Sequence, residues 1–416
     1  MNLDGLTTST LAEVCSLVTD GTHDTPKRVV LGFPLIKAKE IVGGRIDFDT
    51  CDQISEEEHR KVIARSKPEF GDTLFAHIGA SLGEAAFVNT SREFSIKNIA
   101  LFKPNRNVIE PRYLYYLVIS PAFQGIAKGT KTGAAQPFLG LSQLRAHPIE
   151  YHRNLSTQRR IAGILSTYDE LIENSQQRVR LLEAMARAVY REWFVHFRFP
   201  GYEKYLRVAS PLGNIPQGWE VKKLGDIISY NRHVTKPGPH LVERKYVPID
   251  CLPSKSLGLL EAKPIEGAQS SLQLFEKGDI LFGAMRPYFH KVVVAPFAGV
   301  TRTTCFVFKP KQPEWHAFAT MTAFEEGTIG YANSHSQGAT IPYAVWDGSL
   351  SAMPLVLPPK ILLQRFEKIV APMLSRISES FFAVNNLRRT RDLLLPKLMS
   401  GEINLSRAKA PEAIAV

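Results

Sequence analysis

Three segments of the chain contain residue types that catalytic sites use, but none has the spacing that its chemistry requires. A methyltransferase acting on an exocyclic amino group needs Asn or Asp before Pro-Pro and an aromatic residue, whereas Leu357–Lys360 reads LPPK. The glycines and lysines of Gly125–Gly133 lack the GxxxxGK[ST] spacing of a phosphate loop. His23 has no identifiable nucleophile as a partner, so a turn stabilised by aspartates is expected there. We therefore expect no catalysis in this chain.

The four cysteines do not form a metal-binding or disulfide pattern. Cys15, Cys51, Cys251 and Cys305 have no CxxC pairing and no nearby histidine at ligand spacing. The sequence therefore predicts buried free thiols and no metal site.

The charge balance favours a polyanionic partner. The chain has 51 Lys and Arg against 40 Asp and Glu, a formal net charge of +11. An excess of this sign suits nucleic acid, although a merely solvated basic surface would give the same count.

Side chains that contact DNA should lie in loops, with cations at phosphates and Arg, Lys, Asn or Gln at base edges. In the first half we expect contacts from His23, Lys27, Arg28, Arg92, Lys97, Asn98, Lys128 and Lys131, the last two in a predicted glycine-rich loop. In the second half we expect them from Arg232, His233, Lys236, Arg286, Lys291, Arg302 and the loop residues Asn333, His335 and Gln337. Each of these could equally be an ordinary solvated side chain.

The elements that position these residues are repeated within the chain. GDTLF at Gly71–Phe75 recurs as GDILF at Gly278–Phe282, and ALFKP at Ala100–Pro104 recurs as FVFKP at Phe306–Pro310. GAAQPF at residues 133–138 recurs as GATIPY at residues 338–343, and Gln158 matches Gln364. Because the order is kept and the shift stays near 206 residues, we infer an internal duplication of a domain-sized unit.

Each repeat begins with short strand-like runs and ends in a long amphipathic helix. Gly, Pro and Asn separate the runs, which is typical of a mixed, mainly β domain. The helices have apolar residues in alternating steps of four and three, which predicts a coiled-coil seam, although an ordinary amphipathic helix would be the alternative. The seam is predicted to contain Ile161, Leu165, Tyr168, Ile172, Val179, Leu182, Val189, Phe366, Val370, Met373, Ile377, Val384, Leu387 and Leu394. Pro372 and Pro396 should kink the second helix or end it early.

The predicted fold is α+β, with two tandem, mainly β domains, two long antiparallel coiled-coil helices and internal two-fold pseudo-symmetry. The predicted organisation is a first recognition domain at 1–155, a central helical region at 156–200, a linker at 201–218, a second recognition domain at 219–360, a C-terminal helical region at 361–405 and a tail at 406–416. From Ile161 to Trp193 the helix would be about 48 Å long. Such a spacer suits a bipartite DNA site with an unread gap.

These features together resemble the specificity subunit of type I restriction-modification enzymes over nearly the whole chain. TDGTHDTP at Thr19–Pro26 is similar to the opening DGTHxTP pattern of that family. The passages from GAAQPF and from GATIPY into the helices are similar to the junctions between recognition domain and helix in the family. The chain departs from the pattern where HPIEYHRN replaces Pro-Pro before the first helix.

The resemblance implies a DNA-recognition subunit whose two domains each read half of a split site in double-stranded DNA. It also implies that the helices bind two methyltransferase subunits, joined by two restriction motor-nuclease subunits. S-adenosylmethionine, ATP and Mg would then be cofactors of those partners, with none in this chain. A stand-alone regulator that binds a bipartite site is the alternative; an enzyme with its own methyltransferase activity would need the missing motif.

Two further expectations concern the location of the protein. The apolar runs are shorter than the ~18 residues that span a bilayer, and the first residues lack the pattern of a secretion signal. We therefore expect a cytoplasmic protein without a membrane partner.

Overall fold

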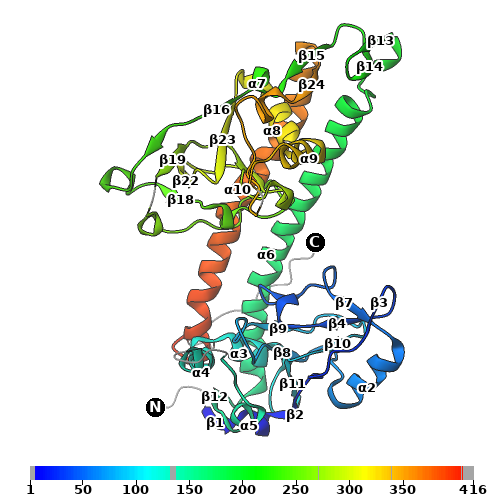
Figure 1. Cartoon of the computed structure of the whole chain (residues 1–416). Helices are drawn as coiled ribbons and strands as arrows, with labels where there is room; N and C mark the ends of the chain where they lie inside the picture. The colour runs from blue at the N-terminus through cyan, green and yellow to red at the C-terminus, as the bar shows by residue number, and fades with distance from the viewer. Residues whose placement is uncertain (1–4, 132–136, 270, 339, 404, 406–416) are drawn as a thin grey trace. The chain divides into compact units, whose positions relative to one another are not determined.

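The computed structural model describes the chain except residues 1–4, 132–136, 270, 339, 404 and 406–416 (Figure 1). The chain forms two compact units, of which unit 1 comprises Met1–Glu170 with Arg388–Val416 and unit 2 comprises Leu171–Leu387. Two long helices, α6 (Leu155–Tyr190) and α10 (Lys360–Met399), each contribute to both units. Unit 1 is therefore built from both ends of the chain.

Unit 1 contains two four-stranded sheets. One has the strand order β2-β11-β8-β9 and is antiparallel, and the other has the order β10-β4-β7-β3 with one parallel pair. Its strands are β1 (Leu6–Thr10), β2 (Cys15–Asp20), β3 (Arg28–Val29), β4 (Phe33–Ile36), β5 (Ile41–Val42), β6 (Arg45–Ile46), β7 (Asp52–Ile54), β8 (Thr73–Phe75), β9 (Ala85–Phe87), β10 (Ser95–Ile96), β11 (Ala100–Pro104) and β12 (Pro148–His152). Its short helices are α1 (Leu11–Val14), α2 (Glu56–Ser66), α3 (Pro111–Ile119), α4 (Pro121–Lys131) and α5 (Leu141–Ala146).

Unit 2 also contains two four-stranded sheets. The sheet β16-β23-β20-β21 is the counterpart of β2-β11-β8-β9, and a second sheet has the order β17-β19-β22-β18 with one parallel pair. Its strands are β13 (Arg207–Ser210), β14 (Gly213–Pro216), β15 (Glu220–Lys223), β16 (Ile228–Tyr230), β17 (Val234–Thr235), β18 (Lys245–Tyr246), β19 (Leu272–Phe275), β20 (Ile280–Gly283), β21 (Val292–Val294), β22 (Gly299–Arg302), β23 (Cys305–Pro310) and β24 (Pro354–Leu357). Its short helices are α7 (Leu224–Ile227), α8 (His316–Phe324) and α9 (Glu326–Ser334).

The strand register confirms the duplication. Phe75 of β8 pairs with Ala100 of β11, and Phe282 of β20 pairs with Phe306 of β23, so the shift near 206 residues holds for both strands. The predicted α+β fold with mainly β domains is confirmed. Proline opens a helical segment in each unit, because Pro111 begins α3 and Pro313 begins a 3-10 turn before α8.

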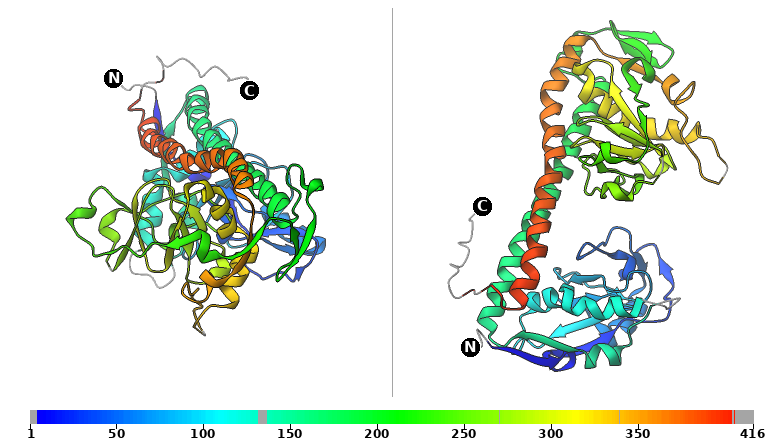
Figure 2. Two further views of the ribbon diagram at one scale, coloured as in Figure 1. Left: turned by 90° about the horizontal axis from the view of Figure 1, so that it is seen from above. Right: turned by 90° about the vertical axis from the view of Figure 1, so that its left-hand side faces the viewer.

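Within each unit, the segments of α6 and α10 run antiparallel and lie side by side (Figure 2). In unit 2 the ring of Phe366 packs on Tyr190, with centroids 6.2 Å apart, while Val179 and Ile377 both approach Gly258. The residue numbers in these two pairs have the same sum, as an antiparallel register requires. In unit 1, Ile161 and Leu165 share a core cluster with Leu395 and Leu398.

Neither Pro372 nor Pro396 ends helix α10, contrary to the early end considered for it. Pro372 lies inside the helix, and α10 continues for three residues beyond Pro396 to Met399. Both prolines are exposed, so the carbonyl group that loses its donor can be hydrated, while the opposite face is held by core contacts. No helix among the described residues is long and apolar enough to cross a membrane.

Candidate nucleic-acid interface

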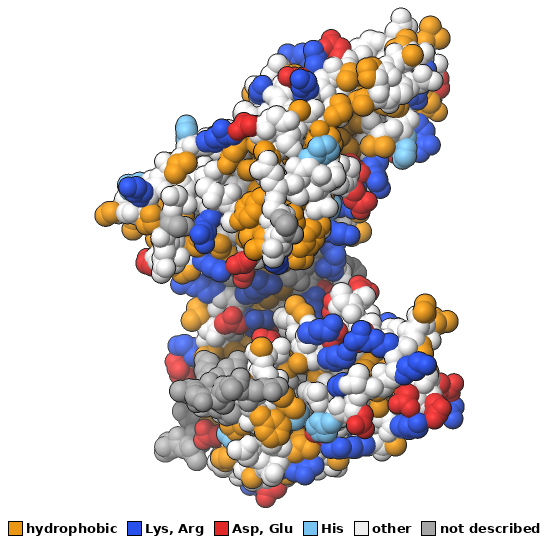
Figure 3. Space-filling view, in the orientation of Figure 1, with side chains coloured by type: hydrophobic (Ala, Val, Ile, Leu, Met, Phe, Trp, Pro, Cys, Tyr) orange, Lys and Arg blue, Asp and Glu red, His pale blue; other side chains and the backbone are white. Residues whose placement is uncertain are grey.

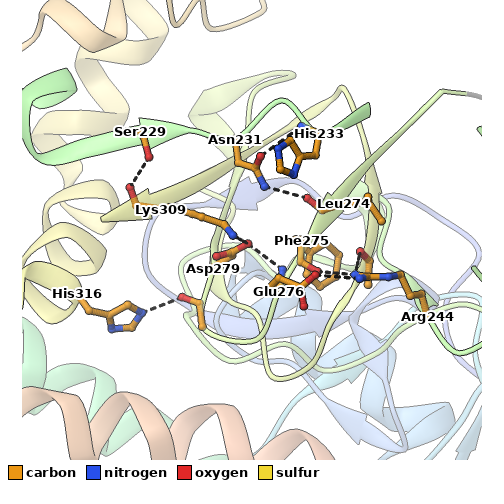
Figure 4. A network of polar contacts seen from close by, with 12 residues as sticks. Ser229, Asn231, His233, Arg244, Leu274, Phe275, Glu276, Asp279, Lys309 and His316 are labelled. Carbon is orange, nitrogen blue, oxygen red and sulfur yellow. Dashed lines mark hydrogen bonds and ion pairs between the residues drawn. The ribbon is translucent and has the colours of Figure 1, made fainter. Parts of the chain in front are cut away.

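The landmarks shared by the two repeats are structural. In unit 2, Asp279 accepts a hydrogen bond from the backbone N–H of Glu276 (2.8 Å) and lies 3.6 Å from Lys309 Nζ (Figure 4). In unit 1, Asp72 accepts the same backbone bond from Glu69 (2.8 Å) and lies 2.7 Å from Lys103. The two repeated motifs, GD and FKP, therefore supply a buried carboxylate and its lysine in each unit.

Burial raises the pKa of both aspartates, against the opposing effect of their lysines. The glycines before them, Gly71 and Gly278, have φ of +99° and +89°, a region that other residues adopt only with strain. These motifs hold the sheets together, so the residues that distinguish one repeat from the other must lie elsewhere.

In unit 1, the end of β2 and the turn between β10 and β11 bring three predicted residues together. His23 Nδ1 lies 2.9 Å from Asn98 Oδ1, and its Nε2 lies 2.9 Å from Asp20 Oδ2. Lys97 donates to Thr25 Oγ1, and its backbone bridges to Thr22. Asn98 has φ of +54°, so the turn is held in a conformation that asparagine tolerates better than most residues.

Three other predicted residues of the first half lie at different places. Arg28 is exposed and its Nε lies 3.1 Å from Asp52, while the guanidinium of Arg92 lies 5.1 Å from the ring centre of Phe48. Lys27 is exposed. We call the group formed by His23, Lys97 and Asn98 the His23 cluster. Arg28 and Arg92 make their contacts with residues outside it.

The glycine-rich loop predicted around Lys128 and Lys131 is wrong, because both residues belong to helix α4. Phe123 and Ala127 of this helix are buried in the core of unit 1, and that packing outweighs the low helix propensity of the glycines. The side chains of Lys128 and Lys131 lie outside the described residues, as does part of the GAAQPF landmark.

In unit 2, the predicted residues are spread over several loops. Arg232 pairs with Asp347 and lies 4.8 Å from the ring centre of Tyr230. His233, Lys236 and Arg302 are exposed. Lys291 is half-buried and donates to the carbonyl of Ile249 (2.9 Å).

Arg286 and the segment from Asn333 to Gln337 form a second group in unit 2. The backbone N–H of Arg286 donates to Pro342 (2.8 Å), and Tyr343 exchanges two backbone bonds with Gln337. Asn333 lies near the end of α9 and not in a loop, because the helix continues to Ser334. His335 stacks on Tyr331 with centroids 4.0 Å apart.

Several exposed residues beside these groups were missed by the sequence analysis. Arg65 pairs with Asp20 next to His23, and Lys255 donates its backbone N–H to His290 beyond Arg286. Tyr288 and Phe289 are exposed aromatic residues in the same turn as Arg286. Their exposure depends on the turn conformation, for which the sequence alone carries no signal. On the face shown in Figure 3, hydrophobic side chains lie among Lys and Arg over both units.

The predicted seam residues of α6 and α10 are all at least half-buried. The buried members are Ile161, Leu165, Ile172, Val179, Phe366, Val370, Ile377 and Val384, and the half-buried members are Tyr168, Leu182, Val189, Met373, Leu387 and Leu394. Arg391 of α10 is a polar residue in the same three-and-four spacing as these apolar residues. Its guanidinium lies 2.6 Å from Asp169 of α6.

The cysteine thiols are placed where the reactive thiolate form is disfavoured. Cys15, Cys251 and Cys305 are buried and Cys51 is half-buried, all as free thiols. Burial raises the pKa of Cys15 to about 12 and those of Cys251 and Cys305 to about 11, which disfavours the reactive thiolate. Among the described residues, no group of three or more His, Cys, Asp or Glu is placed to hold a metal ion.

Comparison with known proteins agrees with this arrangement. Residues 4–184 match the family described as the type I restriction modification DNA specificity domain. The chain is 26% identical over 405 residues to the type I restriction enzyme MjaIX specificity subunit of Methanocaldococcus jannaschii, covering 89% of this chain and 90% of the relative. It is also 26% identical over 298 residues to the putative MjaX specificity subunit of the same organism, covering 69% and 68%.

Among solved structures, the type I restriction-modification S subunit from M. genitalium has a similar fold, with a TM-score of 0.58 at 14% identity. The likeness covers 96% of this chain and 97% of the other. The chain is thus similar to type I restriction enzyme specificity subunits over most of its length, and residues 4–184 match their DNA specificity domain.

Proposed function

We propose that this chain selects the DNA site of a type I restriction-modification complex, with each unit reading one half of a bipartite sequence. The observation that carries the proposal is the duplication: two units share one sheet order and one set of structural contacts, but differ in the loops beside them. A shared scaffold with different loops suits two half-sites of different sequence.

In this proposal the chain is not an enzyme, and catalysis belongs to its partners. Two methyltransferase subunits bind the helices α6 and α10, and two restriction motor-nuclease subunits join them. S-adenosylmethionine, ATP and Mg are then cofactors of those subunits, and the complex works in the cytoplasm. The proposal is supported by the similarity to type I specificity subunits and by the missing methyltransferase and phosphate-loop motifs.

The test is a genome-wide map of methylated adenines in cells that express the methyltransferase subunit with and without this chain. We expect a split motif, methylated on both strands, only when the chain is present. A map that does not change would contradict the proposal and favour a stand-alone regulator. In that case, the isolated chain would still bind a bipartite site.

A matched pair of variants then assigns the half-sites. Lys97→Ala changes the His23 cluster of unit 1, and Arg302→Ala changes an exposed cation of unit 2. We expect each variant to weaken methylation in a way that depends on the sequence of one half-site only. Equal effects on both halves would argue against separate reading.

A further inference from the structure

One surface turn in unit 2 combines backbone strain with exposed aromatic side chains. Residues Pro287–Phe289 form a 3-10 turn, and the residues that flank it, Arg286 and His290, have φ of +51° and +52°. Lys255, whose backbone N–H donates to the His290 carbonyl (2.8 Å), has φ of +55°. These three are among the five non-glycine residues with positive φ in the described part of the chain, so strain is concentrated here.

The strained turn is fixed at both ends. At its start, the N–H of Arg286 donates to the carbonyl of Pro342 (2.8 Å). At its end, the buried ring of His290 places Nε2 2.8 Å from the carbonyl of Phe324. A turn anchored in this way holds its tip in one conformation and limits the entropy lost on binding.

The tip itself presents apolar rings to solvent. Tyr288 is 49% exposed and Phe289 is 44% exposed, with ring centres 4.7 Å apart. Tyr343, 36% exposed, pairs through its backbone with Met285, next to Arg286. The surface therefore combines aromatic rings with a guanidinium and the exposed Lys255. Aromatic or apolar side chains beside cations are the chemistry with which proteins wedge into or stack on DNA bases.

Unit 1 has the same anchor with a different tip. The N–H of Gly79 donates to Pro137 (2.8 Å), as that of Arg286 does to Pro342, and Gly79 also has positive φ, at +78°. The residues that follow Gly79 are Ala80 and Ser81, which have no rings. Because glycine takes this conformation without strain, unit 2 accepts a cost to place an arginine there.

This difference distinguishes DNA from protein as the ligand. Two copies of one methyltransferase subunit would require the same chemistry on both units, whereas two half-sites of different sequence require different tips. From this comparison we propose that Tyr288 and Phe289 form an aromatic wedge that unstacks one base step in the half-site read by unit 2, with Arg286 on the adjacent phosphate or base edge. The inference rests on the proposed function.

The test uses the full chain assembled with its methyltransferase subunits and a duplex that carries the split motif from the methylation map. 2-Aminopurine replaces single bases that are not methylation targets, because its fluorescence rises when it is unstacked. With the native chain we expect a rise at one step of one half-site. The double variant Tyr288→Ala, Phe289→Ala should lose that rise and bind about tenfold or more weakly. The control Tyr202→Ala, an exposed tyrosine outside the turn, should behave as the native chain.

A second variant separates a binding role from a structural one. Arg286→Gly relieves the strain, so its melting temperature should not fall, yet its affinity for the motif should. A fall in melting temperature with unchanged affinity would make the turn a structural element and overturn the proposal.

Two other results would also overturn it. One is a double variant that binds and unstacks the duplex as the native chain does. The other is a double variant that loses its methyltransferase subunits while the isolated chain keeps its DNA affinity, which would assign the surface to a protein. If no split motif is methylated at all, the proposed function fails before this test begins.

Discussion

At the residue scale, Glu183 of α6 is the clearest case of a buried charge with a structural task. Its Oε1 accepts hydrogen bonds from Ser256 Oγ (2.6 Å), Leu257 N–H (2.7 Å) and Gly258 N–H (3.2 Å). Burial raises the pKa of this carboxyl above its ordinary value of 4.5, although the three donors oppose the shift. The carboxylate thus ties the long helix to a loop of unit 2, at the cost of desolvating a charge.

The raised pKa predicts how stability depends on pH. The folded protein binds this proton more tightly than the unfolded chain, so the contribution is fullest below pH 4.5 and is lost as pH rises through the raised value. Glu183→Gln keeps an acceptor oxygen without the charge. Between pH 4 and pH 8, the free energy of unfolding of this variant should therefore decrease by less than that of the native chain. Glu183→Ala, which has no acceptor, should have a lower free energy of unfolding than the native chain at every pH. Parallel curves for the native chain and Glu183→Gln, measured by urea unfolding, would contradict this.

Asp169 is a second residue whose effect can be predicted. It accepts hydrogen bonds from Tyr116 Oη and from Arg391 Nη1, both at 2.6 Å, and the side chains of Asp169 and Arg391 are 25% and 22% exposed. Asp169→Ala leaves the buried hydroxyl of Tyr116 without its acceptor and removes one of the two carboxylates that pair with Arg391, so it should cost roughly 1–3 kcal/mol of unfolding free energy. Asp392→Ala is the control, since Asp392 pairs with the same arginine but is 61% exposed. Similar losses for both variants would show that burial does not decide the effect.

At the element scale, the burial of the apolar residues of α6 and α10 was predictable, whereas the partner of the polar residue Arg391 was not. Period alone identifies the apolar members, because buried faces of helices recur every three or four residues. It gives no reason for Arg391, since the partner Asp169 lies more than two hundred residues earlier in the chain. Likewise, a proline inside a helix is judged by its local cost, while the tertiary contacts that carry α10 past Pro372 are not visible in the sequence.

The same substitution, isoleucine to aspartate, should have different effects on the two faces of α10. Ile377 is fully buried in a core cluster that also contains Val179 of α6, whereas Ile369 on the same helix is 40% exposed. Ile377→Asp buries an unpaired charge and should cost more than about 4 kcal/mol, enough to lose the cooperative unfolding of unit 2 and the proposed binding of methyltransferase subunits. Ile369→Asp should stay folded. Size exclusion and urea unfolding measure both; a folded, assembled Ile377→Asp complex would refute the seam.

At the scale of the whole molecule, the sequence predicted the duplication and the mainly β plan, because both can be recognised from the order of residues without knowing which side chains meet in space. The surface was harder to predict. His23, Lys97 and Asn98 do come together, but Lys291 is used by a backbone carbonyl and Tyr288 and Phe289 were not considered. A list of polar loop residues contains no information on which turns project and which side chains already have partners.

The net charge of +11 gives a prediction for binding as a whole. If Lys97 neutralises one phosphate, Lys97→Ala should lower affinity and reduce the slope of log K against log salt by about 0.9. Lys61→Ala is the matched control, because Lys61 is an exposed cation already paired with Glu57 and Glu58. Titrations of the motif duplex at several salt concentrations give both slopes, and an unchanged slope for Lys97→Ala removes it from the phosphate contacts.

The division of the chain also has a consequence for biosynthesis. Unit 2 is one continuous stretch, Leu171–Leu387, so all of its residues have been made before the last helix segment leaves the ribosome. Unit 1 begins first but needs Leu395 and Leu398 to cover Ile161 and Leu165, and these two leucines are synthesised after all of unit 2. Unit 1 therefore keeps an apolar helix face uncovered until the residues that follow unit 2 have been made. A chain stopped at residue 387 should protect unit 2 from protease while leaving unit 1 open to cleavage.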